Sequence, residues 1–332
     1  MPFSHHSHSG QFCPGHAKNS LEEIIQTAIA RNMQLFCLSE HMLRLKEDFY
    51  PDEVPHVFLR HQESQWEADY IQIETSTEEG LRENEAMYFL EALRLRKKYA
   101  GQIKIVIGLE IDWIRPSSFD LIQRSLTIFP FEFFVGSVHH VHTIPIDYDS
   151  PMYIQARDAA GGTDERLFED YFDIQYEMLT QLKPPVVGHF DLIRLKSDDP
   201  NRCLKSLPGV WERIQRNLGF VAGYGGMIEL NSAALRKGLS EPYPKAEICE
   251  EFLTLNGRFC LSDDSHGVDQ VASNYHLVLN FVEFIGISTL HYLDLSTDSD
   301  VSEVLDDRFP RTQTRSISLS EVKQLPFWLT KE

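Results

Sequence analysis

Short apolar runs alternate with longer amphipathic stretches along most of the chain, and this alternation limits the possible folds more than any other feature. The apolar runs are too short for helices and rich in β-branched or aromatic residues, so each predicts a buried strand. They cover residues 35–38, 103–109, 131–135, 185–187, 227–230 and 258–261. Helical periodicity marks residues 20–31, 83–99 and 167–182, and Ser20 is a suitable N-cap for the first of these. Strands that alternate with helices predict an α/β fold with parallel pairing and helices outside.

The expected domain organisation follows from composition and from two segments that break the pattern. The 332 residues are 42% hydrophobic, which is enough to bury a large core. No linker or internal repeat divides the chain, so we expect a single domain over residues 1–332. Residues 44–79 are acidic, aromatic and weakly periodic, and residues 147–165 contain Ala-Ala-Gly-Gly. We expect both segments to be irregular insertions, the second of them a long loop.

The charge and the cysteine count exclude several classes of protein. The net charge is −19, from 50 acidic and 31 basic residues, so nucleic acid and anionic membrane surfaces are not expected partners. No apolar run has the length of a membrane span, and the N-terminus MPFSHH has no signal-peptide pattern. The five cysteines are an odd number without CxxC spacing, which favours reduced thiols. We therefore expect a cytoplasmic protein.

Histidine or carboxylate side chains follow most of the predicted strands, at the point where each strand ends. In a β/α barrel the carboxyl ends of all strands meet on one face, where chemistry takes place. The polar residues at these ends are His41, Glu110, His139, His140, His189, Asn231, Arg236, Asp263, Asp264 and His266. A single histidine or carboxylate at such a position is more often a structural core or interface residue than a metal ligand. Their repetition at strand ends favours one shared site.

The N-terminal stretch SHHSHSGQFCPGH holds four histidines. A purification-tag remnant or a frayed tail is one explanation, although a tag would be an unbroken run. The alternative is that this stretch forms the first strand of the barrel. Successive strand residues point to opposite faces, so His6 and His8 would share one face while His5 and Ser7 face away. A His-x-His pair on one face is suited to binding a metal ion.

The donors gathered in this way are imidazoles and carboxylates. This mixture suits Zn, Fe or Mn better than Ca or Mg, which prefer oxygen ligands alone. Cys13 and Cys37 lie near the candidate ligands in the sequence, so thiolate ligation is an alternative.

The ordered set of motifs resembles the polymerase and histidinol phosphatase (PHP) family of metal-dependent phosphoesterases. The matching segments are HHSHSG, PGH, LSEH, GLEID, GSVHH, VVGHFD, LNSAALRKGLSEPYP and LSDDSHG, which occur in the family's order between residues 6 and 266. Within the family they are similar to the fungal branch that acts on L-histidinol phosphate. The resemblance implies a distorted (β/α)7 barrel around two or three divalent metal ions.

The resemblance also implies a set of metal ligands. A first metal would be bound by His6, His8, Glu110 and Asp264, a second by Glu110, His139 and His189, and a third by His16, His41 and His266. Many family members have Asp at the position of His16, so the identity of the third metal is less well defined by the resemblance.

Two of these assignments have close competitors in the sequence. His140 and His142 lie beside His139, which is chosen on the GSVH match alone. Asp263 directly precedes Asp264, and the D-x-H spacing favours the second aspartate.

The implied reaction is hydrolysis of a phosphate monoester, with Glu110, Asp264 and Arg236 as catalytic residues. Clustered metal ions neutralise phosphate oxygens and lower the pKa of a bound water. They also reverse the local charge, which lets an acidic protein bind an anion. Arg236 would contact the phosphate, with Lys237 and Arg44 as the next candidates. Alternatively, Arg236 is a surface residue at the start of a helix.

The expected substrate is L-histidinol phosphate, hydrolysed to L-histidinol and phosphate in histidine biosynthesis. Its amine is cationic, so a carboxylate would suit it, and Asp191 or residues of the 44–79 insertion are candidates. One alternative is a PHP-family phosphoesterase that acts on a different monoester or a nucleotide. Two others are a metal-dependent amidohydrolase and a non-catalytic metal-binding or scaffold protein. The oligomeric state and the native metals do not follow from the sequence.

Overall fold

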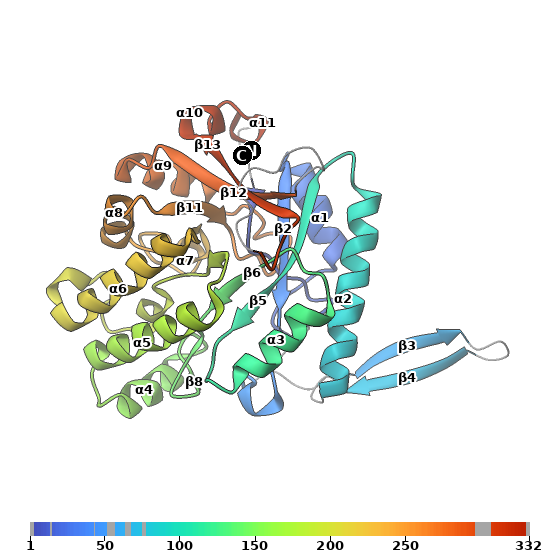
Figure 1. Ribbon diagram of the computed structural model, residues 1–332, viewed down its shortest axis with the longest axis horizontal. Coiled ribbons are helices and arrows are strands. Elements are labelled where there is room, and N and C mark those ends of the chain that lie inside the picture. Colours follow the sequence, from blue (N-terminus) through green and yellow to red (C-terminus); the bar gives the residue numbers. More distant parts are fainter. Residues whose placement is uncertain are drawn as a thin grey trace.

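The computed structural model describes residues 3–13, 15–42, 44–51, 57–63, 68–74, 78–295 and 307–329. Its centre is a seven-stranded sheet in which neighbouring strands are parallel and follow one another in chain order (Figure 1). The strands are β1 (Phe3–Ser4), β2 (Leu35–His41), β5 (Lys104–Asp112), β6 (Phe133–Ser137), β9 (Val186–Val187), β10 (Met227–Asn231) and β11 (Arg258–Ser262). Every apolar run that predicted a strand overlaps a strand of this sheet.

The first and last strands of the sheet lie beside each other, which nearly closes it into a barrel. The backbone N–H of His5 donates to the carbonyl oxygen of Leu261 at 3.2 Å. An isolated parallel bridge joins Ser7 to Ser265 just beyond the ends of β1 and β11. The expected α/β fold, a distorted (β/α)7 barrel, is confirmed.

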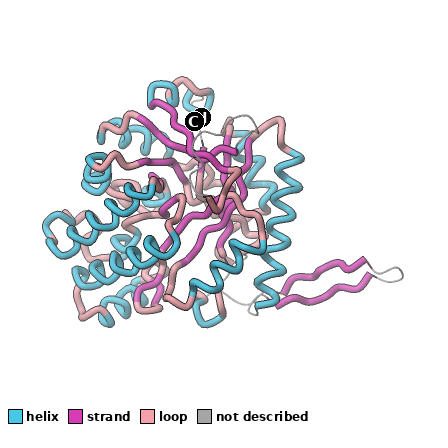
Figure 2. The backbone as a smooth tube through the Cα atoms, in the orientation of Figure 1, coloured by secondary structure: helices cyan, strands magenta, loops and turns pink. Residues whose placement is uncertain are grey.

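A helix follows each strand and packs on the outside of the barrel (Figures 1 and 2). These helices are α1 (Leu21–Ala30), α2 (Glu78–Lys98), α3 (Ser118–Ile128), α5 (Asp164–Leu182), α6 (Pro208–Tyr224), α8 (Ala246–Thr254) and α9 (Tyr275–Ile285). Ser20 caps α1 as predicted, in a capping box with Glu23. The buried apolar residues form one cluster that extends from Phe3 to Val322. The single domain over residues 1–332 stays a prediction.

A C-terminal hairpin covers the amino-terminal end of the barrel. It consists of β12 (Thr289–Leu295) and β13 (Thr312–Ser318), and it is followed by α10 (Leu319–Val322) and α11 (Pro326–Leu329). Lys104, at the start of β5, pairs with Asp294 at 3.0 Å. The Thr312 hydroxyl donates to the carbonyl oxygen of Glu132, just before β6. The opposite end, where the strands finish, is left for the polar side chains.

The expectation that residues 147–165 form a long loop is wrong. This segment contains α4 (Ser150–Ala159) and the start of α5. Asp149 caps α4, because its side chain accepts a hydrogen bond from the Met152 backbone N–H at 2.8 Å. Tyr153 and Ala156 are the buried residues of α4, so its apolar face is too narrow to give a clear periodic signal.

The 44–79 insertion is also more regular than expected. It contains a short 3₁₀ helix η1 (Lys46–Asp48), an antiparallel hairpin of β3 (Val57–Glu63) and β4 (Ala68–Glu74), and the start of α2. Figure 1 shows the hairpin extending away from the barrel beside α2. Residues 52–56, 64–67 and 75–77 of this insertion lie outside the described residues.

Among the described helices, none combines the length and the apolar composition that a membrane span requires.

Candidate metal centre and active site

The N-terminal histidines lie inside the barrel. β1 ends at Ser4, but the chain continues along β2 and carries His6 and His8, whose side chains are fully buried. His6 Nε2 lies 3.2 Å from Glu110 Oε1, and His8 Nε2 lies 3.3 Å from Asp264 Oδ1. His5 faces away from them, with its Nδ1 3.1 Å from the Leu261 carbonyl oxygen. The stretch is therefore part of the fold, and the tag or frayed-tail explanation is wrong.

Glu110, near the end of β5, lies at the centre of the polar cluster. Its Oε1 is 3.2 Å from His189 Nε2 and 3.5 Å from His139 Nε2. Its Oε2 is 2.8 Å from His41 Nδ1, at the end of β2. One carboxylate therefore contacts imidazoles that come from three different strand ends.

Further histidines gather around His41, which contacts Glu110. The His8 and His41 rings stack with their centroids 3.9 Å apart. The His16 ring centroid lies 4.7 Å from that of His41 and 4.8 Å from that of His266. All nine residues predicted as metal ligands therefore meet at the carboxyl ends of the strands.

Three groups of these side chains place their donor atoms within 4.8 Å of one another. The groups are His8, His41 and His266; His6, His8 and Glu110; and Glu110, His139 and His189. His16 and Asp264 lie beside these groups without belonging to one. None of the groups found among the described residues contains a cysteine. Cys37 is buried in the apolar core, and burial raises the pKa of its thiol well above its usual range.

The chemistry of this donor set fits divalent metal ions. Among the described residues, His6 Nε2, both ring nitrogens of His8 and His41 Nε2 are buried without a hydrogen-bond partner. A buried polar atom is costly unless it is hydrogen-bonded or bound to a metal. Imidazole and carboxylate donors in groups of three suit Zn, Fe or Mn.

Neighbouring carboxylates hold the imidazoles in place, and sequence reasoning missed them. Glu229 Oε2, on β10, lies 3.1 Å from His6 Nδ1, and Asp112 Oδ1, on β5, lies 3.4 Å from His139 Nδ1. Such contacts fix the ring orientation of metal-binding histidines. Strand alternation was the available signal, because Asp112 is two residues beyond Glu110 and must share its face.

The charges within the cluster compensate one another. Burial alone would raise the pKa of the Glu110 carboxyl, but the imidazoles of His6, His139 and His41 outweigh it and hold the pKa well below its usual range. Burial alone would lower the pKa of His139, but Asp112 and Glu110 raise it to about 9. The site therefore keeps its carboxylates ionised in spite of their burial.

The structure separates the competing residues in each pair. Asp264 has a left-handed backbone, with φ of 48°, and its carboxylate lies in the cluster. Asp263 instead accepts hydrogen bonds from the backbone N–H groups of Ala272 and Ser265, and burial raises the pKa of its carboxyl to about 6.

A similar separation distinguishes the neighbours of His139. His140 Nδ1 lies 3.2 Å from Asp112 Oδ2, and His140 belongs to none of the three groups of candidate ligands. His142 lies at the surface, where its Nε2 is 2.7 Å from Asp170.

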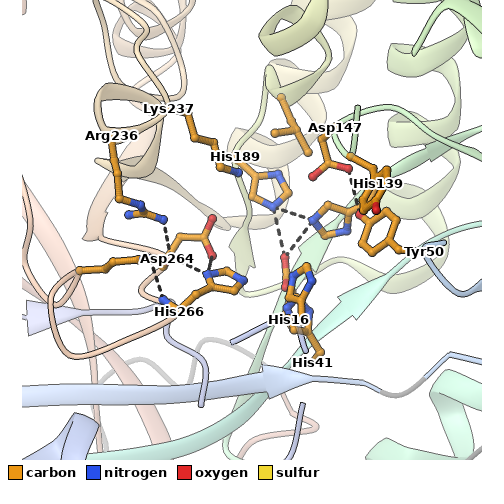
Figure 3. A pocket seen from close by; sticks show the side chains of 14 residues that line it. His16, His41, Tyr50, His139, Asp147, His189, Arg236, Lys237, Asp264 and His266 are labelled. Atoms are coloured by element: carbon orange, nitrogen blue, oxygen red, sulfur yellow. Dashed lines mark hydrogen bonds and ion pairs between the residues drawn. The ribbon is translucent and has the colours of Figure 1, made fainter. Parts of the chain in front are cut away.

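The cluster forms the floor of a pocket of about 340 Å³ (Figure 3). Arg236, at the end of α7 (Ala233–Arg236), and Lys237 line one side of it. Arg236 donates to the carbonyl oxygens of Asp263 and Asp264 at 3.2 and 3.1 Å. Arg44 does not belong to the lining residues, and it pairs with Asp112 at 3.2 Å in a buried position. Two of the three predicted phosphate contacts therefore reach the pocket.

Several known proteins are similar to this chain in sequence or in fold. A "Probable histidinol-phosphatase" of Schizosaccharomyces pombe is 40% identical over 302 residues, which cover 90% of this chain and 92% of the relative. A "Histidinol-phosphatase" of Saccharomyces cerevisiae is 31% identical over 98% of both chains. The crystal structure of a histidinol phosphate phosphatase from Lactococcus lactis, complexed with Zn, L-histidinol and phosphate, has the same fold. It matches with a TM-score of 0.65 and 21% identity, over 87% of this chain and 95% of that one.

The family model described as the PHP domain matches residues 4–233. This range includes most of the polar cluster, from His6 after β1 to His189 after β9. The match covers more than half of the chain and agrees with both fungal relatives, so the chain belongs to the PHP domain family.

Proposed function

We propose that this protein is a metal-dependent phosphatase that hydrolyses L-histidinol phosphate to L-histidinol and phosphate in histidine biosynthesis. The observation that carries the proposal is the placement of three ligand groups, two of which share Glu110, on the floor of a pocket lined by Arg236 and Lys237. Two fungal relatives that align with most of the chain are named as histidinol-phosphatases, which supports this substrate.

The proposed centre binds two or three divalent ions, Zn, Fe or Mn. The first metal would be held by His6, His8, Glu110 and Asp264, the second by Glu110, His139 and His189, and the third by His16, His41 and His266. The imidazole-rich donor set and the Zn in the related Lactococcus lactis structure support this choice of metals. His16 lies beside the third group in ring contact with His41 and His266, which supports its inclusion.

The chain's own residues bind and orient the substrate. Divalent ions at this site supply positive charge to the phosphate oxygens and acidify a water molecule. Arg236 and Lys237 add cationic donors from the pocket wall, and a guanidinium can contact two phosphate oxygens at once. Glu229 and Asp112 keep the imidazoles of His6 and His139 in fixed orientations.

Phosphate release from a panel of monoesters, with and without a chelator, tests the proposal. We expect the highest kcat/KM on L-histidinol phosphate and loss of activity in the chelator. A faster reaction on another monoester or on a nucleotide would support a different PHP-family phosphoesterase. Hydrolysis of cyclic amides alone would support an amidohydrolase, and inactivity with bound metal would support a binding or scaffold role. Metal analysis of the freshly purified protein counts and identifies the ions.

The proposal includes a small-molecule substrate, no nucleic-acid or membrane partner, and a location in the cytoplasm. The net charge of −19 supports the absence of a nucleic-acid or anionic-membrane partner. No disulfide joins the five cysteines in the described part of the chain, and four of the five are buried, which supports a reducing compartment.

A further inference from the structure

The two walls of the pocket carry opposite charge. Figure 3 shows Arg236 and Lys237 on one side and Asp147 with Tyr50 on the other, with the histidines between them. The cations and the predicted metal ligands account for recognition of a phosphate dianion. Neither accounts for a carboxylate on the facing wall, which would repel that anion. Asp147 therefore requires a separate explanation.

Local structure places the Asp147 side chain at this wall. After His139 the chain makes a small antiparallel hairpin of β7 (His140–Val141) and β8 (Ile144–Pro145). The Ile146 N–H then donates to the His139 carbonyl oxygen at 2.9 Å. This hydrogen bond returns the chain to the metal cluster, so that Asp147 is the next residue to face the pocket.

One oxygen of Asp147 is held and the other is available. Tyr50 Oη donates to Asp147 Oδ1 at 2.9 Å. Asp147 Oδ2 accepts no hydrogen bond from any described residue, and the side chain is only half-buried. Tyr50 is itself buried, because its ring stacks on His16 and His140. The carboxylate is thus oriented before a ligand enters, which reduces the entropy cost of binding a cation.

The other acidic candidate for this role does not reach the pocket. Asp191 is fully buried, and its Oδ2 accepts hydrogen bonds from Arg194 Nε at 2.8 Å and from the Lys245 backbone N–H at 3.1 Å. It does not belong to the residues that line the pocket. Its charge is used within the protein, and the carboxylate that faces the ligand is Asp147.

The geometry points to Asp147 as the residue that selects phosphate monoesters with a cationic amine, by accepting a hydrogen bond from that amine. The inference deepens the proposed function and rests on it. L-Histidinol phosphate carries a primary amine two carbons from its ester oxygen, and this amine is protonated at neutral pH. With the phosphate bound between the metal ligands and Arg236, the amine side of the molecule faces the opposite wall.

The test compares L-histidinol phosphate with its deamino analogue, 3-(imidazol-4-yl)propyl phosphate. The unmodified protein should prefer the amine-bearing ester by roughly ten- to a hundredfold in kcat/KM, which is the effect of one charge-assisted hydrogen bond. Asp147→Asn should lose most of this preference because it slows only L-histidinol phosphate. The change should be mainly in KM, since the amine contact is the same in the ground and transition states.

Controls separate recognition from structure. Metal content should stay the same in Asp147→Asn. Asp170→Asn, which changes a surface carboxylate outside the pocket lining, should leave both substrates unaffected. Tyr50→Phe removes the hydrogen bond but keeps the carboxylate, so it should reduce the preference for the amine by less than Asp147→Asn does.

Two results would overturn the inference. One is equal hydrolysis of both esters by the unmodified protein, a measurement that needs no variant. The other is an Asp147→Asn variant that slows both esters by the same factor, which would mean that Asp147 only positions Tyr50. Failure of the unmodified protein to release phosphate from either ester would instead show that the proposed function itself is wrong.

Discussion

Glu229 Oε2 lies 3.1 Å from His6 Nδ1, across 223 residues of sequence and in a fully buried position. A carboxylate can only accept a hydrogen bond, so Nδ1 carries the proton. The other ring nitrogen, Nε2, lies 3.2 Å from Glu110 and 3.6 Å from Asp264, where its lone pair would be available to a metal ion bound with these carboxylates. Glu229 also accepts a hydrogen bond from the His189 backbone N–H at 2.6 Å. One carboxylate behind the cluster therefore positions two of the predicted metal ligands.

Replacement of Glu229 should weaken metal binding although Glu229 is not a predicted ligand. Glu229→Ala should lower metal affinity or activity by roughly ten- to a hundredfold, as is usual for residues that orient metal-binding histidines. Glu229→Gln should be milder, because its amide oxygen can still accept from His6. The measurement is kcat/KM and bound metal over a titration with added Zn or Mn. Unchanged metal affinity in Glu229→Ala would show that His6 does not need this support.

Arg236→Ala should separate phosphate recognition from metal binding. Loss of a charge-assisted contact should lower kcat/KM by roughly ten- to a hundredfold, whereas metal content should remain because arginine is not a ligand. Arg236→Lys should not restore the rate fully, since an ammonium cannot donate to two oxygens in the same geometry. His189→Ala is the comparison variant, and it should lose metal and activity together. If Arg236→Ala has the kinetics of the unmodified protein, Lys237 becomes the leading candidate.

Removal of metal should destabilise the protein as well as inactivate it. Without ions, His6 Nε2, both ring nitrogens of His8 and His41 Nε2 are buried without a hydrogen bond. A ligand that binds only the folded state also adds stability in proportion to the logarithm of its concentration over its Kd. The midpoint of thermal unfolding should therefore fall on dialysis against a chelator and return with added metal. A metal-free protein with full activity and an unchanged midpoint would contradict the metal centre.

The strands and the cluster of candidate metal ligands were predictable because their signals are local. All five residues of β10 are buried, as required of a strand between the barrel interior and covering helices, and Met227, Ile228 and Leu230 give this run its apolar signal. His41 is the last residue of β2, and Glu110 directly follows the apolar run at 103–109. Because β2 and β5 are parallel neighbours, these two residues lie opposite each other. When seven parallel strands follow one another in chain order, the residues at their carboxyl ends must lie at the same end of the barrel.

The remaining features depend on contacts between distant parts of the chain. Arg44 was predicted to contact the phosphate, but its charge is compensated by Asp112, 68 residues away. The roles of Glu229 and Asp147 likewise follow from partners on other elements, His6 and Tyr50. The hydrophobic periodicity of one segment does not show which residue of another segment its side chains will contact.

Glu85, on α2, should make the stability of the protein depend on pH. Burial raises the pKa of its carboxyl from 4.5 to about 7, although the hydrogen bond from Ser125 Oγ at 2.8 Å opposes the shift. The folded state therefore binds the proton more tightly than the unfolded state does. The stabilisation from the bound proton is fully present below about pH 4.5 and is lost as the pH rises through 7.

Glu85→Gln should remove this dependence. Its amide oxygen can still accept from Ser125, and it carries no charge to bury, so the variant should be more stable than the unmodified protein at pH 8, with a much smaller difference at pH 5. The shift of about 2.5 pKa units sets an upper limit of about 3.4 kcal/mol on the gain. Thermal unfolding from pH 5 to 9 at saturating metal gives the measurement, with the exposed Glu79→Gln on the same helix as control. A difference between Glu85→Gln and the unmodified protein that is constant over this range would mean that Glu85 does not titrate as its burial predicts.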